Sequence, residues 1–529
     1  MTYEATKLGP FVGGLHNSSS GEFINDDELW ECVNLEVDND GSLVNRPEIK
    51  KFITSGFNAS QCSLLGVYIP NDGRKFLVVY SPGDNKVYLV DAVSGAANAV
   101  ASPVGVNSVC CAQYANRLWV VSKTGASANG GYFDAPTPST ITWTTVAAMP
   151  RGEAITQYKE RLWIACGLSA TSNTSRFSFS GVGPLTDTWG GTDFVDVAPG
   201  NGQKLVSLVR LGSDLILFKE HSTHRFTYST DPRKAELTEI DGSIGVPAVN
   251  CIVTYNNNTV YAMHDNAVYE LFQMTYTRIT TLVDMEQTSD LDLFAKDQYG
   301  LTLHRDRLFV RYFKNLYIYS LKIKRWSTWE STRKFSRVVV IPSATTGLDT
   351  AYASSASQTK PSELYYFQDI RKLNYTGGTP TDIMEVFKGR ITTKTYDFDN
   401  PHSFKVIFWW GLSIATSGST LSYIIIPNAN KNRTWRSVRD QYGTWPAAQA
   451  GQQTWASNAD VVITDTTLVS YGQYARKFYK LLKKMRFRQI YFKIEFDIVG
   501  NTITDDSSIR VYDLTAFVKQ KETVVKEVS

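Results

Sequence analysis

Residues 116–121 read Asn-Arg-Leu-Trp-Val-Val, a charged turn that runs directly into an apolar strand. The pattern returns at 160–165 as Glu-Arg-Leu-Trp-Ile-Ala and at 306–311 as Asp-Arg-Leu-Phe-Val-Arg. Weaker copies complete an alignment on seven positions, Lys75, Arg117, Arg161, Asp214, Thr259, Arg307 and Glu363. Successive positions lie 42, 44, 53, 45, 48 and 56 residues apart. A repeat of about 40–50 residues built from strands and turns is the spacing of a β-propeller blade.

A second apolar and aromatic run follows most copies, after turn-forming Gly, Asn, Asp and Pro. The clearest second runs are Val87–Val90, Arg176–Phe179, Arg225–Tyr228, Ala267–Leu271 and Leu316–Tyr319. Two β-rich runs bridged by turn residues predict a hairpin, and two hairpins per repeat predict a four-stranded blade. Alternating hydrophobic residues also occur in other all-β folds. We expect an all-β chain in which residues 56–380 form a β-propeller of about seven blades.

Length and composition favour a large globular protein. The chain has 529 residues, of which 43% are hydrophobic and 20% charged, so two or three domains with sizeable cores are expected. Aromatic residues are plentiful, with 28 Tyr, 26 Phe and 12 Trp, which favours strands over helices. The net charge of +3 is close to neutral for this size, so total charge neither indicates nor excludes a nucleic-acid partner.

The chain shows no targeting or membrane signal. Residues 1–7, Met-Thr-Tyr-Glu-Ala-Thr-Lys, lack the basic start and apolar run of a signal peptide. No stretch approaches about 18 uninterrupted apolar residues, so we expect no membrane insertion. The six cysteines show no Cys-x-x-Cys pairing, and several fall in expected strands, where a free cysteine behaves as a small buried hydrophobe. We expect the protein to fold in a reducing cytoplasm.

Residues 1–55 do not follow the repeat. Asn25 precedes three acidic residues, which predicts the cap and first turn of a short helix. Asn39-Asp40-Gly41 predicts a hairpin turn between Val37 and Val44. A calcium-binding loop is the competing interpretation, with acidic residues and glycine at its first, third, fifth and sixth positions, Glu36, Asp38, Asp40 and Gly41. Its twelfth position would be Pro47 instead of glutamate, so we predict the turn.

This segment resembles the start of a bacteriophage structural family. Two motifs carry the resemblance, Gly-Gly-Leu-x-Asn at 13–17 and Asp-Gly-Ser-Leu-Val-x-Arg-Pro at 40–47, with an acidic predicted helix ending at Asn34 between them. The family includes tail nozzle and DNA-stabilisation proteins of short-tailed phages and minor tail proteins of some long-tailed phages. Several members are built on a β-propeller. The family usually has Arg-Pro-Gly where this chain has Arg46-Pro47-Glu48, and the motifs cover about 40 of 529 residues. The resemblance implies a virion component without specifying its position.

A Gly/Thr/Pro-rich stretch at 374–382 predicts a linker, and residues 381–529 predict a second β domain, a β-sandwich or jelly-roll. Strands are expected at 404–410, 421–426 and 490–496. In the last of these, alternate residues are apolar and share one face, Ile490, Phe492, Ile494 and Phe496. The terminal residues 519–529 are either a frayed end or an arm that docks on a neighbouring subunit.

The residues that could support chemistry give weak signals. His221 and His224 are close in sequence, but a His-x-x-His pair on a strand or turn does not project both rings one way, so we predict no metal site. A glycan hydrolase would need two facing carboxylates about 5–10 Å apart. The candidates are Asp187, Asp193, Asp196 and Asp214, although aspartate in blade turns is more often structural. We predict no catalytic residue and no cofactor.

One stretch near the C-terminus is strongly basic and contains no acidic residue. Phe478, Tyr479 and Phe487 interleave with seven cationic residues, Arg476, Lys477, Lys480, Lys483, Lys484, Arg486 and Arg488. The stretch is either a surface for DNA phosphates or an acidic partner subunit, or the solvent face of a strand.

The repeat and the resemblance together predict a non-enzymatic structural component of a bacteriophage tail, either a nozzle or a tail-tip (minor tail) protein. We expect it in the virion, after assembly in the cytoplasm of the host bacterium. Its expected partners are other tail proteins, further copies of itself in a ring, genomic DNA in transient contact and a host surface glycan. The alternative function is a carbohydrate-binding or glycan-cleaving propeller that acts on host surface polysaccharide. A propeller suits a scaffold because radial closure leaves few free strand edges.

Overall fold

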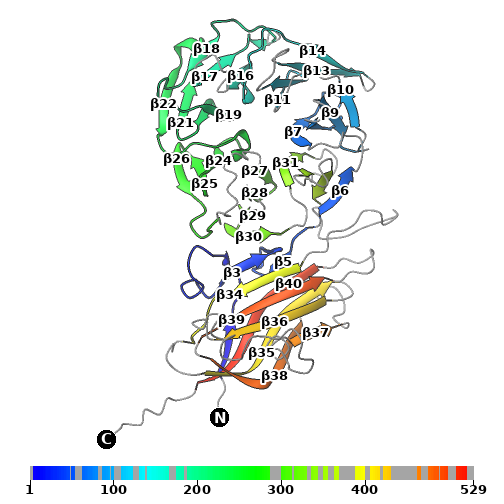
Figure 1. Cartoon of the computed structure of the whole chain (residues 1–529), viewed down its shortest axis with the longest axis vertical. Coiled ribbons are helices and arrows are strands. Elements are labelled where there is room, and N and C mark those ends of the chain that lie inside the picture. Colours follow the sequence, from blue (N-terminus) through cyan, green and yellow to red (C-terminus); the bar gives the residue numbers. More distant parts are fainter. Residues whose placement is uncertain are drawn as a thin grey trace, which may run out of the picture.

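The computed structural model of the chain shows a ring of blades above a two-sheet domain (Figure 1). It describes residues 4–47, 49–53, 62–81, 86–93, 95, 97–100, 109–122, 130–137, 140–165, 174–183, 187–285, 299–312, 315–330, 335–342, 349–355, 363–367, 388–398, 405–417, 421–429, 461–465, 475–487, 489–498 and 508–520. Within these ranges the chain forms strands and two short 3-10 helices, Pro232–Lys234 and Val249–Cys251. None of the helices in this part of the chain has the length and apolarity to cross a membrane.

The predicted propeller is formed by six four-stranded antiparallel sheets and by four antiparallel strands of a ten-stranded sheet, and the all-β fold is confirmed. Blades 1 to 3 comprise β7 (Ser63–Tyr68), β8 (Phe76–Ser81), β9 (Lys86–Asp91) and β10 (Ala97–Val100); β11 (Val109–Tyr114), β12 (Arg117–Ser122), β13 (Gly130–Thr137) and β14 (Thr140–Thr145); and β15 (Ala154–Tyr158), β16 (Arg161–Ala165), β17 (Arg176–Phe179) and β18 (Phe194–Asp196). Blades 4 and 5 comprise β19 (Leu205–Leu211), β20 (Asp214–Lys219), β21 (Thr223–Thr227) and β22 (Glu236–Asp241); and β23 (Ile252–Tyr255), β24 (Thr259–His264), β25 (Ala267–Phe272) and β26 (Thr275–Arg278).

Blade 6 comprises β27 (Tyr299–His304), β28 (Arg307–Tyr312), β29 (Asn315–Ser320) and β30 (Arg325–Trp329). Blade 7 comprises β31 (Phe335–Ile341), β32 (Thr350–Ser355), β33 (Leu364–Phe367) and, from the start of the chain, β6 (Ile49–Ile53). β6 pairs antiparallel with β33, so that Phe367 lies opposite Ile49. An N-terminal strand thus completes the last blade and closes the ring.

The repeated sequence pattern is the turn that joins the first two strands of a blade. Ala115 and Asn116 have φ of 50° and 63°, and Lys159 and Glu160 have φ of 46° and 58°. Two successive left-handed residues match the twist of the flanking strands, which is why polar turn residues precede the second strand. The alignment is wrong in blade 7, where Glu363 precedes the third strand. The second strand begins at Thr350, which is 43 residues after Arg307.

Neighbouring blades are joined by aromatic side chains as well as by apolar packing. Tyr68, the last residue of β7, donates from its hydroxyl to the carbonyl of Asn116 in the next blade's turn at 2.8 Å. Tyr158, the last residue of β15, donates in the same way to Ser213 at 2.6 Å. Each of these first strands is therefore fixed to the turn of the following blade.

The lower domain in Figure 1 is a β-sandwich, as predicted for the C-terminal residues. One sheet has the order β38 (Ala475–Phe487), β35 (Lys405–Ser417), β40 (Ser508–Gln520), β5 (Leu43–Asn45) and β4 (Leu35–Val37), with β1 (Glu4–Leu8) beside β40. The other continues the ten-stranded sheet from β30 of blade 6, with which β3 pairs in parallel. Its order from there is β3 (Glu28–Val33), β34 (Lys388–Thr393), β39 (Ile490–Ile498), β36 (Leu421–Ala429) and β37 (Val461–Asp465), with β2 (Gly14–Leu15) beside β3. The alternation predicted for 490–496 is present, and each of Ile490, Phe492, Ile494 and Phe496 is 0% exposed.

The N-terminal segment belongs to this sandwich. β1 pairs with β40, and β3 pairs with β34, so Cys32 lies opposite Ile391. The short helix predicted from Asn25 is not formed. Residues 25–28 make a turn in which the Glu28 carboxylate accepts the Asn25 N–H at 2.8 Å, and β3 begins at Glu28. Long-range strand pairing therefore overrides the local helix signal.

The hairpin predicted around Asn39-Asp40-Gly41 is formed, with Val37 opposite Leu43. Asp40 accepts hydrogen bonds from the Ser42 N–H at 2.9 Å and hydroxyl at 2.6 Å, and it pairs with Arg510 at 2.6 Å. Partial burial opposes ionisation, but the Ser42 hydrogen bonds and the Arg510 charge lower the pKa of Asp40. The carboxylate is engaged within the protein. The predicted linker at 374–382 and residues 521–529 of the predicted arm lie outside the described residues.

Candidate functional site

The basic stretch lies mainly on β38, which is the edge strand of its sheet among the described residues. The backbone register places Arg476 opposite Ser413, Lys480 opposite Trp409 and Arg486 opposite Val406. A register shift between Ile407 and Trp409 sets residues 481–484, which include Lys483 and Lys484, opposite one residue of β35. Lys477 lies opposite Leu412, and Arg488 is outside the described residues. The backbone thus carries this cationic run along a sheet edge.

Three of the four candidate carboxylates are paired with arginine. Asp196 binds Arg176 through two contacts of 2.9 and 3.2 Å. Asp214 pairs with Arg225 at 2.8 Å. Asp193 pairs with Arg233 and also accepts the Gly190 N–H at 3.0 Å. Asp187 is exposed in a turn. Asp193, Asp196 and Asp214 therefore have structural partners within blades 3 and 4.

The two histidines that are close in sequence differ in their surroundings. His224 is buried, with its Nε2 3.2 Å from the Ser222 hydroxyl, and burial lowers the pKa of its imidazole. His221 is exposed and its ring contacts His264 at 5.6 Å between centroids. Across the part of the chain that the structure describes, no three His, Cys, Asp or Glu side chains are grouped to hold a metal.

The junction between sandwich and propeller is dense with polar contacts. Asn34, with φ of 57°, donates its N–H to Thr328 at 2.7 Å and accepts the Glu330 N–H on Oδ1 at 2.9 Å. Thr328 donates its hydroxyl to the Cys32 carbonyl at 2.9 Å. Beside them, Arg307 at the start of β28 pairs with Glu36 of β4 at 2.7 Å. Blade 6 is thereby attached to β3 and β4 of the sandwich.

A second group of charges crosses the same junction. Arg390 of β34 binds Glu31 at 2.6 Å and Glu330 at 2.9 Å, while Thr392 donates to Glu31 at 2.7 Å. Burial opposes the charged form of Arg390, but Glu31 and Glu330 raise its pKa. One buried apolar cluster also runs from sandwich residues such as Leu29 to blade residues such as Trp326. The two domains share a core.

The motifs at 13–17 and 40–47 lie at or next to this junction. Gly14 has φ of +69°, and a Cβ on it would lie 2.9 Å from the Trp326 carbonyl oxygen. Asn17 accepts the Asp284 N–H at 2.9 Å. Arg46 is 1% exposed, with its guanidinium carbon 5.7 Å from the ring centre of Trp329. These residues hold the sandwich against the propeller.

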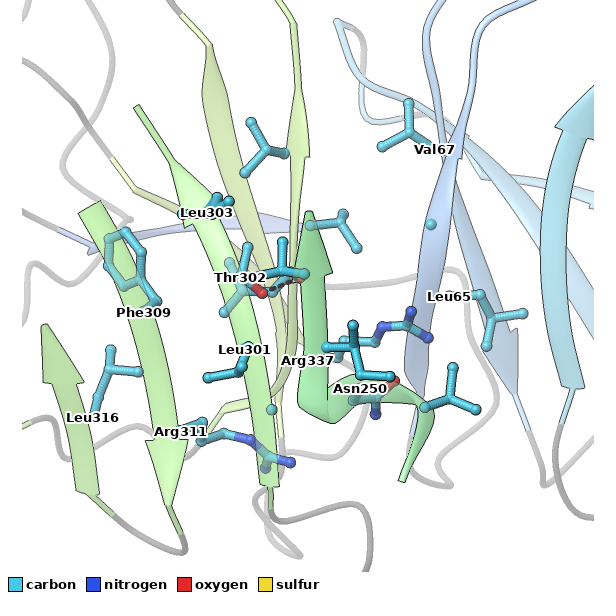
Figure 2. A pocket seen from close by; sticks show the side chains of 18 residues that line it. Leu65, Val67, Asn250, Leu301, Thr302, Leu303, Phe309, Arg311, Leu316 and Arg337 are labelled. Carbon is cyan, nitrogen blue, oxygen red and sulfur yellow. Dashed lines mark hydrogen bonds between the residues drawn. The ribbon is translucent and has the colours of Figure 1, made fainter. Parts of the chain in front are cut away.

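A cavity of about 410 Å³ lies between the inner strands of blades 1, 5, 6 and 7 (Figure 2). Its walls are mainly aliphatic, and its 18 lining residues include two arginines, one asparagine and no acidic residue. The polar members are Asn250, Thr302, Arg311 and Arg337. This volume lies within the range of small-molecule sites.

The two arginines differ in their surroundings. Arg311 of β28 is 6% exposed and donates to the Phe335 carbonyl at 2.7 Å and the Tyr299 carbonyl at 3.3 Å. It lies opposite Gly300, which has no side chain to obstruct it. Arg337 is partly exposed and lies at a register shift of β31, between Phe335 and Val338. Such bulges redirect side chains and are frequent beside functional sites.

Cys111 of β11 borders this region. A Cβ on Gly66, which lines the cavity, would lie 3.2 Å from the Cys111 sulfur. Burial raises the pKa of the Cys111 thiol to about 11, with Arg337 acting in the opposite direction. The sequence did not identify Arg311 or Arg337 as site residues. The signal that could have found them was an arginine inside each apolar strand, Arg-Leu-Phe-Val-Arg-Tyr at 307–312 and Phe-Ser-Arg-Val-Val-Val-Ile at 335–341.

No protein-family model matches the chain, and no curated protein matches it in sequence. Among solved structures, it is similar to an inactive variant of virginiamycin B lyase from Staphylococcus aureus, at 11% identity and a TM-score of 0.42, over 61% of this chain and 99% of that one. It is also similar to the N-terminal domain of Nup159, at 12% identity and a TM-score of 0.37, over 64% and 98%. An extracellular domain from B. thetaiotaomicron matches at 10% identity and a TM-score of 0.45, over 90% of this chain and 64% of that one.

Proposed function

We propose that the protein is a structural component of a bacteriophage tail, of the nozzle, DNA-stabilisation or minor tail class. The observation that carries the proposal is the path of the N-terminal segment. Residues 4–45 supply β1–β5 to the sandwich and its junction, and β6 then closes the propeller. One short segment therefore unites both domains into a single body.

The resemblance to the phage family supports the same proposal. The motif residues that carry it, among them Gly14, Asn17 and Arg46, make the contacts between sandwich and propeller. Because these motif residues lie at an internal junction, the motif specifies how the two domains pack together and does not mark a ligand-binding site. A rigid two-domain body suits a part that transmits load and presents fixed surfaces to its neighbours.

In this role the protein would assemble in the host cytoplasm and reside in the virion. Its neighbours would be other tail proteins and further copies of itself in a ring. The edge strand β38 is the surface we assign to a transient contact with genomic DNA, because its sequence carries six of the seven basic residues of the stretch. Glycan cleavage is less well supported, since Asp193, Asp196 and Asp214 are each engaged by an arginine.

The first test is the solution mass of the full-length protein, with negative-stain averages of the same peak. Closed rings of several copies support the nozzle-type role. A strictly monomeric protein that binds host polysaccharide would overturn it in favour of the carbohydrate-binding alternative.

The DNA contact has its own test. Replacing Arg476 and Lys480, which are four residues apart on β38, with glutamine should reduce the salt dependence of duplex DNA binding, by a log–log slope of about 0.9 for each phosphate that the protein no longer neutralises. The matched control replaces two exposed lysines elsewhere, Lys234 and Lys322, and should leave the slope unchanged. Equal effects of both pairs would remove β38 from the DNA contact.

A further inference from the structure

The cavity between blades 1, 5, 6 and 7 combines an apolar wall with cationic side chains. Leucine and valine side chains from β7, β23, β27 and β31 form most of the wall. Figure 2 shows Arg337 extending from the blade 7 side toward the strand that carries Leu65 and Val67. With two arginines and no acidic residue in the lining, the cavity favours a negative charge.

The geometry assigns different roles to the two arginines. Arg311 spans from β28 to the backbone of β31 and β27 through the carbonyls of Phe335 and Tyr299, so it holds the wall together. Arg337 is partly exposed and is placed by the bulge in β31. A guanidinium in such a position recognises carboxylate, sulfonate or phosphate groups through paired N–H donors.

We propose that this cavity binds a small organic anion, with the apolar body of the ligand against the leucine and valine wall and its acidic group on Arg337. The volume of about 410 Å³ lies in the range of small-molecule sites, so the ligand we propose is a compact molecule. Asn250 lies on the same wall as Arg311, since a Cβ on Gly300 would lie 3.7 Å from the Asn250 Cβ and 4.0 Å from Arg311 Nε. Asn250 supplies an amide to orient the ligand. This site is independent of the proposed tail function.

The test uses the full-length protein and anilinonaphthalene sulfonate, an aromatic anion whose fluorescence rises in an apolar site. Its neutral counterpart, N-phenylnaphthylamine, reports the apolar part alone. Arg337→Met removes the charge and keeps the length of the side chain. The matched control is Arg210→Met, which alters an exposed arginine on the inner strand β19, away from the cavity lining.

We expect one sulfonate bound per chain in the wild type and in Arg210→Met. Arg337→Met should weaken sulfonate binding by about 10- to 100-fold, the effect of losing a hydrogen bond to a charged group. The same variant should change binding of the neutral probe by less than about 3-fold, because the apolar wall is intact. Decanoate should displace the sulfonate from the wild type.

A second variant covers the wall. Val67→Phe places a ring in the cavity and should weaken both probes, while thermal unfolding checks that the variant is folded. Equal sulfonate binding by Arg337→Met and Arg210→Met would overturn the proposal. So would displacement by inorganic phosphate as effective as that by decanoate, since the apolar wall would then have no role.

Discussion

Replacing Gly14 with alanine tests how closely the sandwich and the propeller approach each other. Gly14 lies in β2 with φ of +69°, and an alanine Cβ there would lie 2.9 Å from the Trp326 carbonyl oxygen and 3.2 Å from the Arg325 Cβ. Gly73 offers a matched control in blade 1. Its φ is +82°, and a Cβ on it would have no atom within 4 Å. The two substitutions share the backbone penalty, and only one creates a clash.

The expected magnitudes follow from these geometries. A left-handed alanine costs about 1–2 kcal/mol, and the lower entropy of the unfolded chain offsets about 0.5–1 kcal/mol of that cost. Gly73→Ala should therefore lower the free energy of unfolding by about 0.5–1 kcal/mol. Gly14→Ala adds a contact with backbone that must shift, at about 1–3 kcal/mol for overpacking, giving about 1.5–4 kcal/mol in total.

Urea unfolding followed by tryptophan fluorescence measures both variants against the wild type. Trp326, whose carbonyl oxygen the new methyl group would approach, is one of the 12 tryptophans that contribute to this signal. Calorimetry of the same samples reports whether Gly14→Ala splits the transition. An effect of Gly14→Ala no larger than that of Gly73→Ala would refute the close packing at the junction.

Three further outcomes are expected. Trp163 is fully buried, so Trp163→Ala should lower the free energy of unfolding by about 3–5 kcal/mol. Trp163→Phe keeps an aromatic ring and should lower it by about 1–2 kcal/mol, through loss of the N–H donated to the Tyr158 carbonyl at 2.9 Å. Equal losses in urea unfolding would contradict the argument that ring packing dominates. Lys219→Met should cost about 2 kcal/mol or more, because this fully buried ammonium has four oxygens within hydrogen-bond distance of its three N–H donors, and methionine would leave those oxygens without a donor. An unchanged denaturation midpoint would be inconsistent with that role. Burial lowers the pKa of His304 below 6.5, so the unfolded chain binds a proton at a higher pH than the folded chain does, and the stability of the fold declines as the pH falls below about 6.5. His304→Gln removes this proton uptake and should flatten the dependence of melting temperature on pH between about pH 7.5 and 5.5. An unaltered pH dependence would argue against a role for His304.

The blades were predictable because their signals are local. Turn residues such as Asn116 adopt the left-handed conformation that the hairpin needs, and apolar strands follow them directly. Blade 7 was misaligned because its second strand reads Thr-Ala-Tyr-Ala-Ser-Ser, which lacks large aliphatic residues. The more apolar third strand, Leu-Tyr-Tyr-Phe, matched the pattern instead. The sequence therefore predicts the repeat length of the blades, but it does not predict which strand of blade 7 corresponds to the second strand of the other blades.

The role of the N-terminal segment could not be predicted in the same way. Glu4 of β1 lies opposite Val518 of β40, almost the whole chain away. Such a pairing leaves no periodic trace in the sequence, and the local signal at Asn25 favoured a helix. The cavity arginines present a related difficulty, because a cavity depends on how several blades are placed around the ring. An arginine within an apolar strand was the one clue that the sequence offered.

The path of the first 53 residues has a consequence for how the two domains hold together. β3 pairs with β34 of the sandwich and touches β30 of blade 6, while β6 forms the outer strand of blade 7. Blade 6 is bound to the sandwich through Arg307 and Glu36, so two adjacent blades depend on the same segment. Opening the ring at β6 would release one end of that segment, and separating the sandwich would release the other. The propeller and the sandwich therefore stabilise each other through one stretch of chain, which is the property that a rigid structural part requires.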